Sequence, residues 1–130
     1  MNPTSAAEAY RVASIENAPP LQIVRLLYQG AMRFLDQAQL DRFKPGDPKY
    51  TALVCQADDI IVELRMCLEG TDSEASEVPG NLERLYLYCE TELGRAMSEG
   101  DKAPLANARR VLEILLDAWN SVELGGSAAA

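Results

Sequence analysis

The sequence predicts an all-α protein, an antiparallel four-helix bundle with a flexible N-terminal arm. Three observations support this fold class. Apolar residues recur at alternating spacings of three and four in four stretches of about 20 residues, which is the period of one helix face. Proline and glycine mark the breaks between these stretches, and mostly short breaks favour antiparallel neighbours. No stretch shows the strict alternation that is typical of a half-buried strand.

The composition favours one acidic domain and argues against nucleic acid and membrane partners. The 130 residues are 48% hydrophobic, which supplies enough apolar surface for a single core. The 12 basic and 20 acidic residues leave a net charge of −8, which repels phosphates and anionic lipids. The chain shows no basic start followed by an apolar stretch, and no apolar run approaches the ~18 residues of a membrane span. We therefore expect a cytoplasmic protein without membrane insertion.

Three segments are expected along the chain. Residues 1–16 contain few sizeable apolar side chains and are predicted to form a flexible arm. The bundle is predicted over residues 17–124, and its first helix is expected to begin near Asn17, because Pro19 suits the first helical turn. The small residues of 125–130 are predicted to form a disordered tail.

Two helices are expected in the first half of the bundle. The inner face of the first is marked by the apolar residues Leu21, Val24, Tyr28, Ala31, Leu35 and Ala38. Lys44-Pro45-Gly46 breaks this pattern, and Asp47 then offers a cap for a helix that begins at Pro48. This second helix is predicted over about residues 48–69. Its inner face contains Leu53, Ala57, Ile60, Leu64 and Cys67.

Two further helices follow a polar loop at residues 70–80. Asn81 is expected to cap the third helix and Gly100 to end it, and Asp101 is expected to start the fourth. The third helix has its apolar spacing at Leu82, Leu85, Cys89, Leu93 and Ala96, with Tyr86 and Tyr88 on its flanks. The fourth has its apolar spacing at Leu105, Ala108, Leu112, Leu115, Trp119 and Val122.

The residue types argue against catalysis. The sequence contains no histidine, so it cannot build Ser-His-Asp, Cys-His or histidine-based metal sites. Its cysteines lie in apolar-periodic stretches rather than in C-x-x-C pairs, and we expect them to be reduced and packed as small apolar groups. An enzyme without histidine would need a buried lysine or carboxylate in a pocket, whereas Asp59 and Glu63 are interpreted as solvated surface, as are Arg109 and Arg110. We expect no catalytic residue, no cofactor and no metal.

The fourth helix carries more apolar surface than a bundle core requires. Val111, Ile114 and Ala118 form a second apolar strip beside its main one. One interpretation is that this strip packs inside the bundle or against a second copy of the chain, in a helical homodimerisation or scaffold module. The other is an open groove that accepts amphipathic helices from another protein.

Three stretches, taken in order, add a resemblance. Residues 9–31 contain Tyr10, then Ala-Pro, and then the run Leu-Gln-Ile-Val-Arg-Leu-Leu-Tyr-Gln-Gly-Ala. Residues 81–88 read Asn-Leu-Glu-Arg-Leu-Tyr-Leu-Tyr, and residues 116–119 read Leu-Asp-Ala-Trp. They are similar to the arm tyrosine, the Leu-Ile-x-Met-Leu-Tyr-Asp-Gly-Ala run, the Asn-Leu-x-x-Leu-Tyr-x-Tyr motif and the closing tryptophan of one family. The chain resembles the FliS family of flagellin export chaperones over about residues 9–120.

The resemblance implies a specific function. FliS proteins bind the disordered C-terminal segment of flagellin, which becomes helical on the bundle, and so prevent premature polymerisation before secretion through the flagellar type III apparatus. The implied partner is the C-terminal region of flagellin, and other flagellar regulators or export-gate components are further candidates. The expected oligomeric state is a monomer or a weak dimer. The alternative is a homodimerisation or scaffold module with no flagellin binding.

Two groups of residues are expected to bind the client. The resemblance implies a role for the arm tyrosine and its apolar neighbours, which are Tyr10, Val12 and Ile15. The groove is predicted to contain Leu82, Leu85, Tyr86, Ile114 and Leu115. Core packing explains each of these last five residues about equally well.

Overall fold

The computed structural model describes residues 21–68 and 78–129. Within these two ranges the chain forms helices and no strands, which confirms the predicted fold class. The helices are α2 (Leu21–Ala38), α3 (Pro48–Leu68), α4 (Val78–Ser98) and α5 (Ala103–Ala129). The arm residues Tyr10, Val12 and Ile15, and the expected helix start near Asn17, lie outside the described residues.

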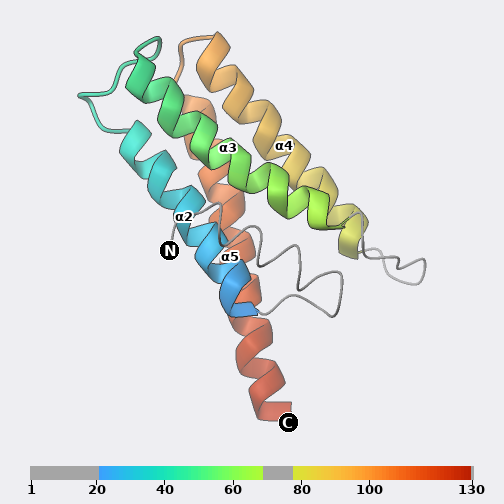
Figure 1. The fold of residues 1–130 in the computed structure, drawn as a ribbon. Helices are drawn as coiled ribbons and strands as arrows, with labels where there is room; N and C mark the ends of the chain where they lie inside the picture. The colour runs from blue at the N-terminus through green and yellow to red at the C-terminus, as the bar shows by residue number, and fades with distance from the viewer. Residues whose placement is uncertain (1–20, 69–77, 130) are drawn as a thin grey trace.

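The four helices run up and down around a shared core (Figure 1). Each helix contacts its two neighbours, in the pairs α2–α3, α3–α4, α4–α5 and α5–α2. Among the described residues the backbones of the diagonal pairs do not approach closely, although Tyr28 of α2 and Tyr86 of α4 meet through their side chains in the core. The bundle therefore has four lines of helix–helix contact, and α4 takes part in two of them, the α3–α4 seam and the α4–α5 seam.

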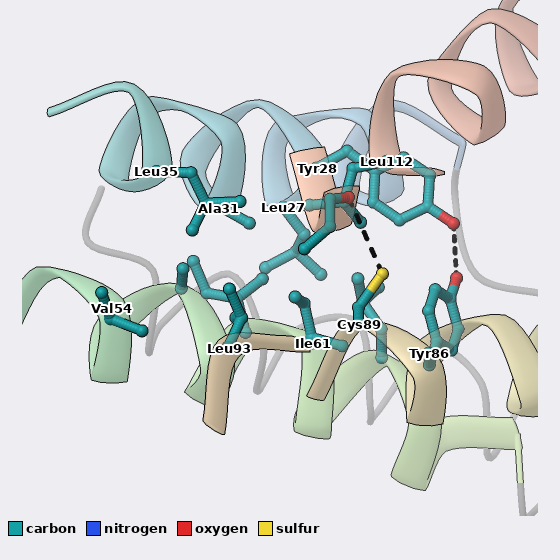
Figure 2. Packing of buried hydrophobic residues seen from close by; sticks show 14 of the residues in the cluster. Leu27, Tyr28, Ala31, Leu35, Val54, Ile61, Tyr86, Cys89, Leu93 and Leu112 are labelled. Carbon is teal, nitrogen blue, oxygen red and sulfur yellow. Dashed lines mark hydrogen bonds between the residues drawn. The ribbon is translucent and has the colours of Figure 1, made fainter. Parts of the chain in front are cut away.

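The core consists of the inner faces of all four helices. The spacing of three and four correctly predicted most of it, because that spacing keeps side chains on one side of a helix. Its largest side chains are almost completely shielded from solvent, and ten residues of the cluster are labelled in Figure 2. They are Val24, Leu27, Tyr28, Leu35, Tyr50, Val54, Ile61, Leu64, Tyr86, Leu93, Leu105 and Leu112.

Of the three predicted caps, Asp101 is in place. Helix α3 begins at Pro48, directly after Asp47 as predicted, but the Asp47 carboxylate accepts a hydrogen bond at 3.2 Å from the Lys44 amide, which precedes the helix. The Asp101 carboxylate accepts a hydrogen bond from the Ala103 amide at 3.0 Å, in the first turn of α5. Gly100 supplies the left-handed residue between α4 and α5, with φ of 68°, a conformation that glycine adopts without strain.

The third cap was predicted wrongly. Helix α4 begins at Val78, three residues before Asn81, because a proline such as Pro79 is tolerated within a first helical turn. The Asn81 side chain accepts a hydrogen bond from Arg84 at 3.2 Å instead of capping the helix.

The C-terminal end also differs from the expectation. A disordered tail was expected over residues 125–130, whereas α5 continues to Ala129 and extends past the end of α2 (Figure 1). Extending an existing helix adds one hydrogen bond for each residue ordered, and alanine is the best helix former. The two glycines at 125–126 are therefore not sufficient to end the helix.

The connections at the other end of the bundle are tied together. The Lys102 ammonium donates to the Leu40 carbonyl at 2.9 Å, and the Gln39 side chain donates to the Lys102 carbonyl at 3.3 Å. The Tyr50 hydroxyl donates to the Ala96 carbonyl at 3.1 Å and so joins α3 to α4. These bonds link the α2–α3 connection to the α4–α5 connection, so this end of the bundle is closed by polar contacts.

Candidate functional site

The five residues predicted for the groove fall into different environments. Leu82 and Tyr86 belong to the core, where they are 9% and 1% exposed. Leu115 is partly buried and packs against that core. Leu85 and Ile114, in contrast, are 38% and 58% exposed. For Leu82 and Tyr86 the structure thus supports core packing, whereas Leu85 and Ile114 are available to a partner.

Two contacts define how α4 and α5 are aligned. The Asn107 amide of α5 donates to the Glu92 carboxylate of α4 at 2.8 Å, and the Cys89 thiol donates to the Ala108 carbonyl at 3.7 Å. Because the two helices are antiparallel, a step toward the N-terminus of α4 matches a step toward the C-terminus of α5. The level of Glu92 and Asn107 therefore serves as a reference for the whole α4–α5 seam.

This alignment brings Leu85 and Ile114 together. Leu85 lies seven residues before Glu92, and Ile114 lies seven residues after Asn107. Seven residues are close to two helical turns, so each side chain returns to the face of its reference residue. Leu85 and Ile114 thus lie on the same seam at one level, about 10 Å along the helices from Glu92 and Asn107.

The neighbouring levels extend this apolar surface. Tyr88 and Val111 lie one turn from Glu92 and Asn107, and Ala118 lies one turn beyond Ile114. Tyr88 is 44% exposed, Ala118 is exposed and Val111 is partly buried. The apolar strip, as we call it, consists of Leu85, Tyr88, Val111, Ile114 and Ala118. The groove prediction missed Tyr88, Val111 and Ala118, although the second apolar strip of the fourth helix was the signal for the last two.

A polar cluster ends the apolar strip. Glu92 is only 4% exposed, yet its carboxylate is fully engaged. One oxygen accepts from Asn107 at 2.8 Å and from the Tyr88 hydroxyl at 3.4 Å, and the other accepts from Arg95 at 2.8 Å. These hydrogen bonds, above all that from Asn107, lower the pKa of Glu92, so the carboxylate is charged at neutral pH. We call Tyr88, Glu92, Arg95 and Asn107 the Glu92 cluster.

Beneath the strip, three aromatic residues join three helices. Tyr28 and Tyr86 share a hydrogen bond between their hydroxyls, and their rings meet edge to face with centroids 6.4 Å apart (Figure 2). The Trp119 indole donates to the Tyr28 hydroxyl at 2.9 Å. Burial raises the pKa of Tyr28, so its hydroxyl stays protonated. This contact joins α2, α4 and α5, and it satisfies polar groups that would be costly to bury alone.

These three aromatic residues come from the three stretches on which the family resemblance rests. The family described as "Flagellar protein FliS" matches residues 3–125, nearly the whole chain. The chain belongs to the FliS family.

Two curated proteins illustrate the relationship. The chain is 32% identical over 122 residues to the flagellar secretion chaperone FliSB of Pseudomonas aeruginosa, which covers 90% of this chain and 94% of that protein. It is 26% identical over 119 residues to the flagellar secretion chaperone FliS of Vibrio cholerae serotype O1, which covers 88% and 86% of the two chains. Membership of the FliS family supports a chaperone role in flagellar export.

The cysteines and Arg109 of this FliS family member have structural environments. Its cysteines are free thiols, and burial raises the pKa of Cys89 to about 12, so this thiol is unreactive at neutral pH. Arg109 was interpreted as solvated, but it bridges α5 to Asp36 of α2 and also pairs with Glu113. No group of three or more His, Cys, Asp or Glu side chains in residues 21–68 and 78–129 is arranged to hold a metal.

One hollow of the surface lies away from the apolar strip. A cavity of about 530 Å³ is lined at the α2–α3 connection by Arg42, Phe43, Asp47, Pro48 and Lys49. It belongs to the polar end of the bundle, where no residue of the strip is found. In the described part of this FliS bundle, no helix combines the length and apolar character needed to cross a bilayer.

Proposed function

We propose that this protein is an export chaperone that binds the C-terminal segment of flagellin in the cytoplasm. Binding would prevent premature polymerisation and assist secretion through the flagellar type III apparatus. The observation that carries this proposal is the apolar strip, which a member of the FliS family exposes on an otherwise acidic bundle. The relatives in Pseudomonas aeruginosa and Vibrio cholerae are named flagellar secretion chaperones, which supports the same role here.

The shape of the strip suits an amphipathic helix. Two rows of apolar side chains lie side by side: Leu85 and Tyr88 span about one turn of α4, and the row from Val111 to Ala118 spans about two turns of α5. A helix with apolar residues at spacings of three and four can lay its apolar face between such rows. Covering half-exposed side chains such as Leu85, Tyr88 and Ile114 contributes roughly 1 kcal/mol each, so several contacts together stabilise a client.

A client that folds on binding fits the needs of export. The ordering of a disordered segment opposes binding and offsets part of the gain from apolar burial. The complex can therefore be specific without becoming irreversible. The arm residues Tyr10, Val12 and Ile15, which the resemblance assigns to client binding, are proposed to contribute from outside the described residues.

Calorimetric titration tests the proposal directly. The purified protein is titrated with a peptide of the C-terminal ~40 residues of flagellin from the same organism, and helicity is followed in parallel. We expect one-to-one binding, a gain of helix and a large negative heat-capacity change. No binding at high micromolar peptide would contradict the proposal.

A pair of surface variants locates the site. Ile114→Ser should weaken binding by about ten-fold or more, because the most exposed apolar side chain of the strip is lost. Leu26→Ser is the matched control: Leu26 is 45% exposed on α2, the helix diagonally opposite α4, and it is not part of the apolar strip. Equal losses in both variants would place the site elsewhere.

Self-association is the competing function. Sedimentation of the protein over a range of concentrations measures it. A dimer that Ile114→Ser dissociates, together with no response to the flagellin peptide, would replace the chaperone proposal with a homodimerisation module.

A further inference from the structure

The apolar strip has one abrupt boundary. Tyr88 and Val111 form its last apolar level, and one turn further along the seam stand Glu92 and Asn107. Arg95, half-exposed, and its ion pair with Glu99 at 2.8 Å cover the surface beyond. The seam therefore changes from apolar to charged within a single turn.

The polar side of this boundary is saturated by the protein itself. The Glu92 oxygens accept hydrogen bonds from Asn107, Tyr88 and Arg95, so the carboxylate does not require a donor from a client. Glu92 itself is only 4% exposed, so a client meets the exposed Asn107 amide and the half-exposed Arg95 guanidinium at this level. An apolar side chain placed there would remove these groups from water without replacing their bonds to water, which is unfavourable. A client helix is thus penalised for placing apolar groups beyond Tyr88.

A buried carboxylate is not what packing alone favours at this level, because a whole buried ion pair can often be replaced by apolar side chains of similar volume without loss of stability. Removing only one partner of such a pair is destabilising. A single polar residue in an apolar seam is, in contrast, an effective device for fixing the alignment of packed helices.

We infer that the Glu92 cluster sets the register of the bound client helix. This inference rests on the proposed function and specifies its partner. The client segment is an amphipathic helix with about two turns of apolar face on the strip. At the end nearest Glu92, the position one turn beyond its last apolar residue is polar. Asn107 and Arg95 meet the client, and the buried Glu92 positions both of them through hydrogen bonds. Tyr88, whose hydroxyl bonds to Glu92, marks the boundary.

Extended client peptides test this inference. The probes are the flagellin C-terminal peptide and two derivatives in which the polar residue one turn beyond either end of its apolar face is replaced by leucine. The wild-type protein should gain less than about two-fold in affinity from the leucine at the Glu92 end. Asn107→Leu should gain about five-fold or more from that same leucine, because an exposed apolar side chain on α5 then makes the strip one turn longer.

Two further variants serve as control and backup. Asn107→Gln keeps an amide at the surface, and its gain should be no larger than that of the wild type. Asn107→Ala removes the amide without adding a large side chain, and it should show a smaller gain in the same direction if Asn107→Leu does not fold. Circular dichroism and thermal melting establish folding of each variant before titration.

The outcomes separate the register role from the function itself. Equal gains for the wild type and Asn107→Leu would overturn the register role while leaving flagellin binding intact. An equal gain for Asn107→Gln and Asn107→Leu would also overturn it, since side-chain size alone would then explain the effect. If the wild type bound none of the three peptides, the proposed function and this inference would fall together.

Discussion

The two seams of α4 shift the pKa values of acidic side chains in opposite directions. In the α4–α5 seam, Glu92 has donors for both carboxylate oxygens, and its pKa is lowered. In the α3–α4 seam, one oxygen of Asp58 is buried without a hydrogen-bond partner, and burial, followed by the nearby Glu90 and Asp59 charges, raises its pKa to about 6. The same bundle therefore keeps the carboxylate of Glu92 charged at neutral pH, whereas the carboxylate of Asp58 in the neighbouring seam has a pKa of about 6.

The seams also differ in their surfaces. The α3–α4 seam is clamped by Arg65, whose guanidinium donates twice to Glu90 at 2.6 and 3.1 Å. The α4–α5 seam has no such clamp along the apolar strip in the described residues, and it exposes Leu85 and Ile114 instead. One side of α4 is thus stabilised by a charged contact, whereas the other retains apolar area for a partner.

The largest expected effect contrasts two tyrosines of α4. Tyr86→Ala should lower the free energy of unfolding by about 3–5 kcal/mol, because it removes a buried ring and its bond to Tyr28. Tyr88→Ala, at the half-exposed edge of the strip, should lower it by less than about 1 kcal/mol. Urea unfolding measures both, with Trp119, the single tryptophan, as fluorescent reporter. Similar losses would contradict the division of α4 into core and surface.

The next effect compares two arginines that each bridge a pair of helices. Arg65→Met should destabilise the protein by about 1–3 kcal/mol, because Glu90 is largely buried and loses its two-point donor. Arg109→Met should have an effect below about 1 kcal/mol, since its partners Asp36 and Glu113 are both half-exposed. Chemical unfolding at two salt concentrations distinguishes the two variants. Equal losses of stability would show that the Arg65–Glu90 pair stabilises the bundle no more than the exposed pairs of Arg109 do.

The smallest effect concerns Asp58 and pH. Its pKa is higher in the folded protein than the ordinary 3.8, so the folded state binds the proton more tightly and Asp58 destabilises the fold as pH rises through 4 to 6. Asp58→Asn should raise the free energy of unfolding at pH 7 by about 1 kcal/mol, since the carboxylate is partly solvated, and by little near pH 4. A uniform change at both pH values would contradict this assignment.

The apolar spacing predicted which helices form and most of what they bury. Leu93, Ala96, Leu105 and Leu112 lie in the core where the period of 3.6 residues placed them. The same spacing treated Leu85 as an inner residue and Tyr86 as a flanking one, and the structure reverses the two. Both choices fit a helical period, so the pattern alone could not separate them.

Sequence by itself determined the fold class, the length of the core faces and the family, because helical period, caps and motif order are all local properties of the chain. Tertiary structure decided the rotation of α4 about its axis, since that depends on how α4 packs against both α3 and α5. This rotation buries Tyr86 against Tyr28 and turns Leu85 and Tyr88 outward beside Ile114. It also closes the Glu92 cluster across the α4–α5 seam, through side chains 15 residues apart in sequence that only helix packing brings together.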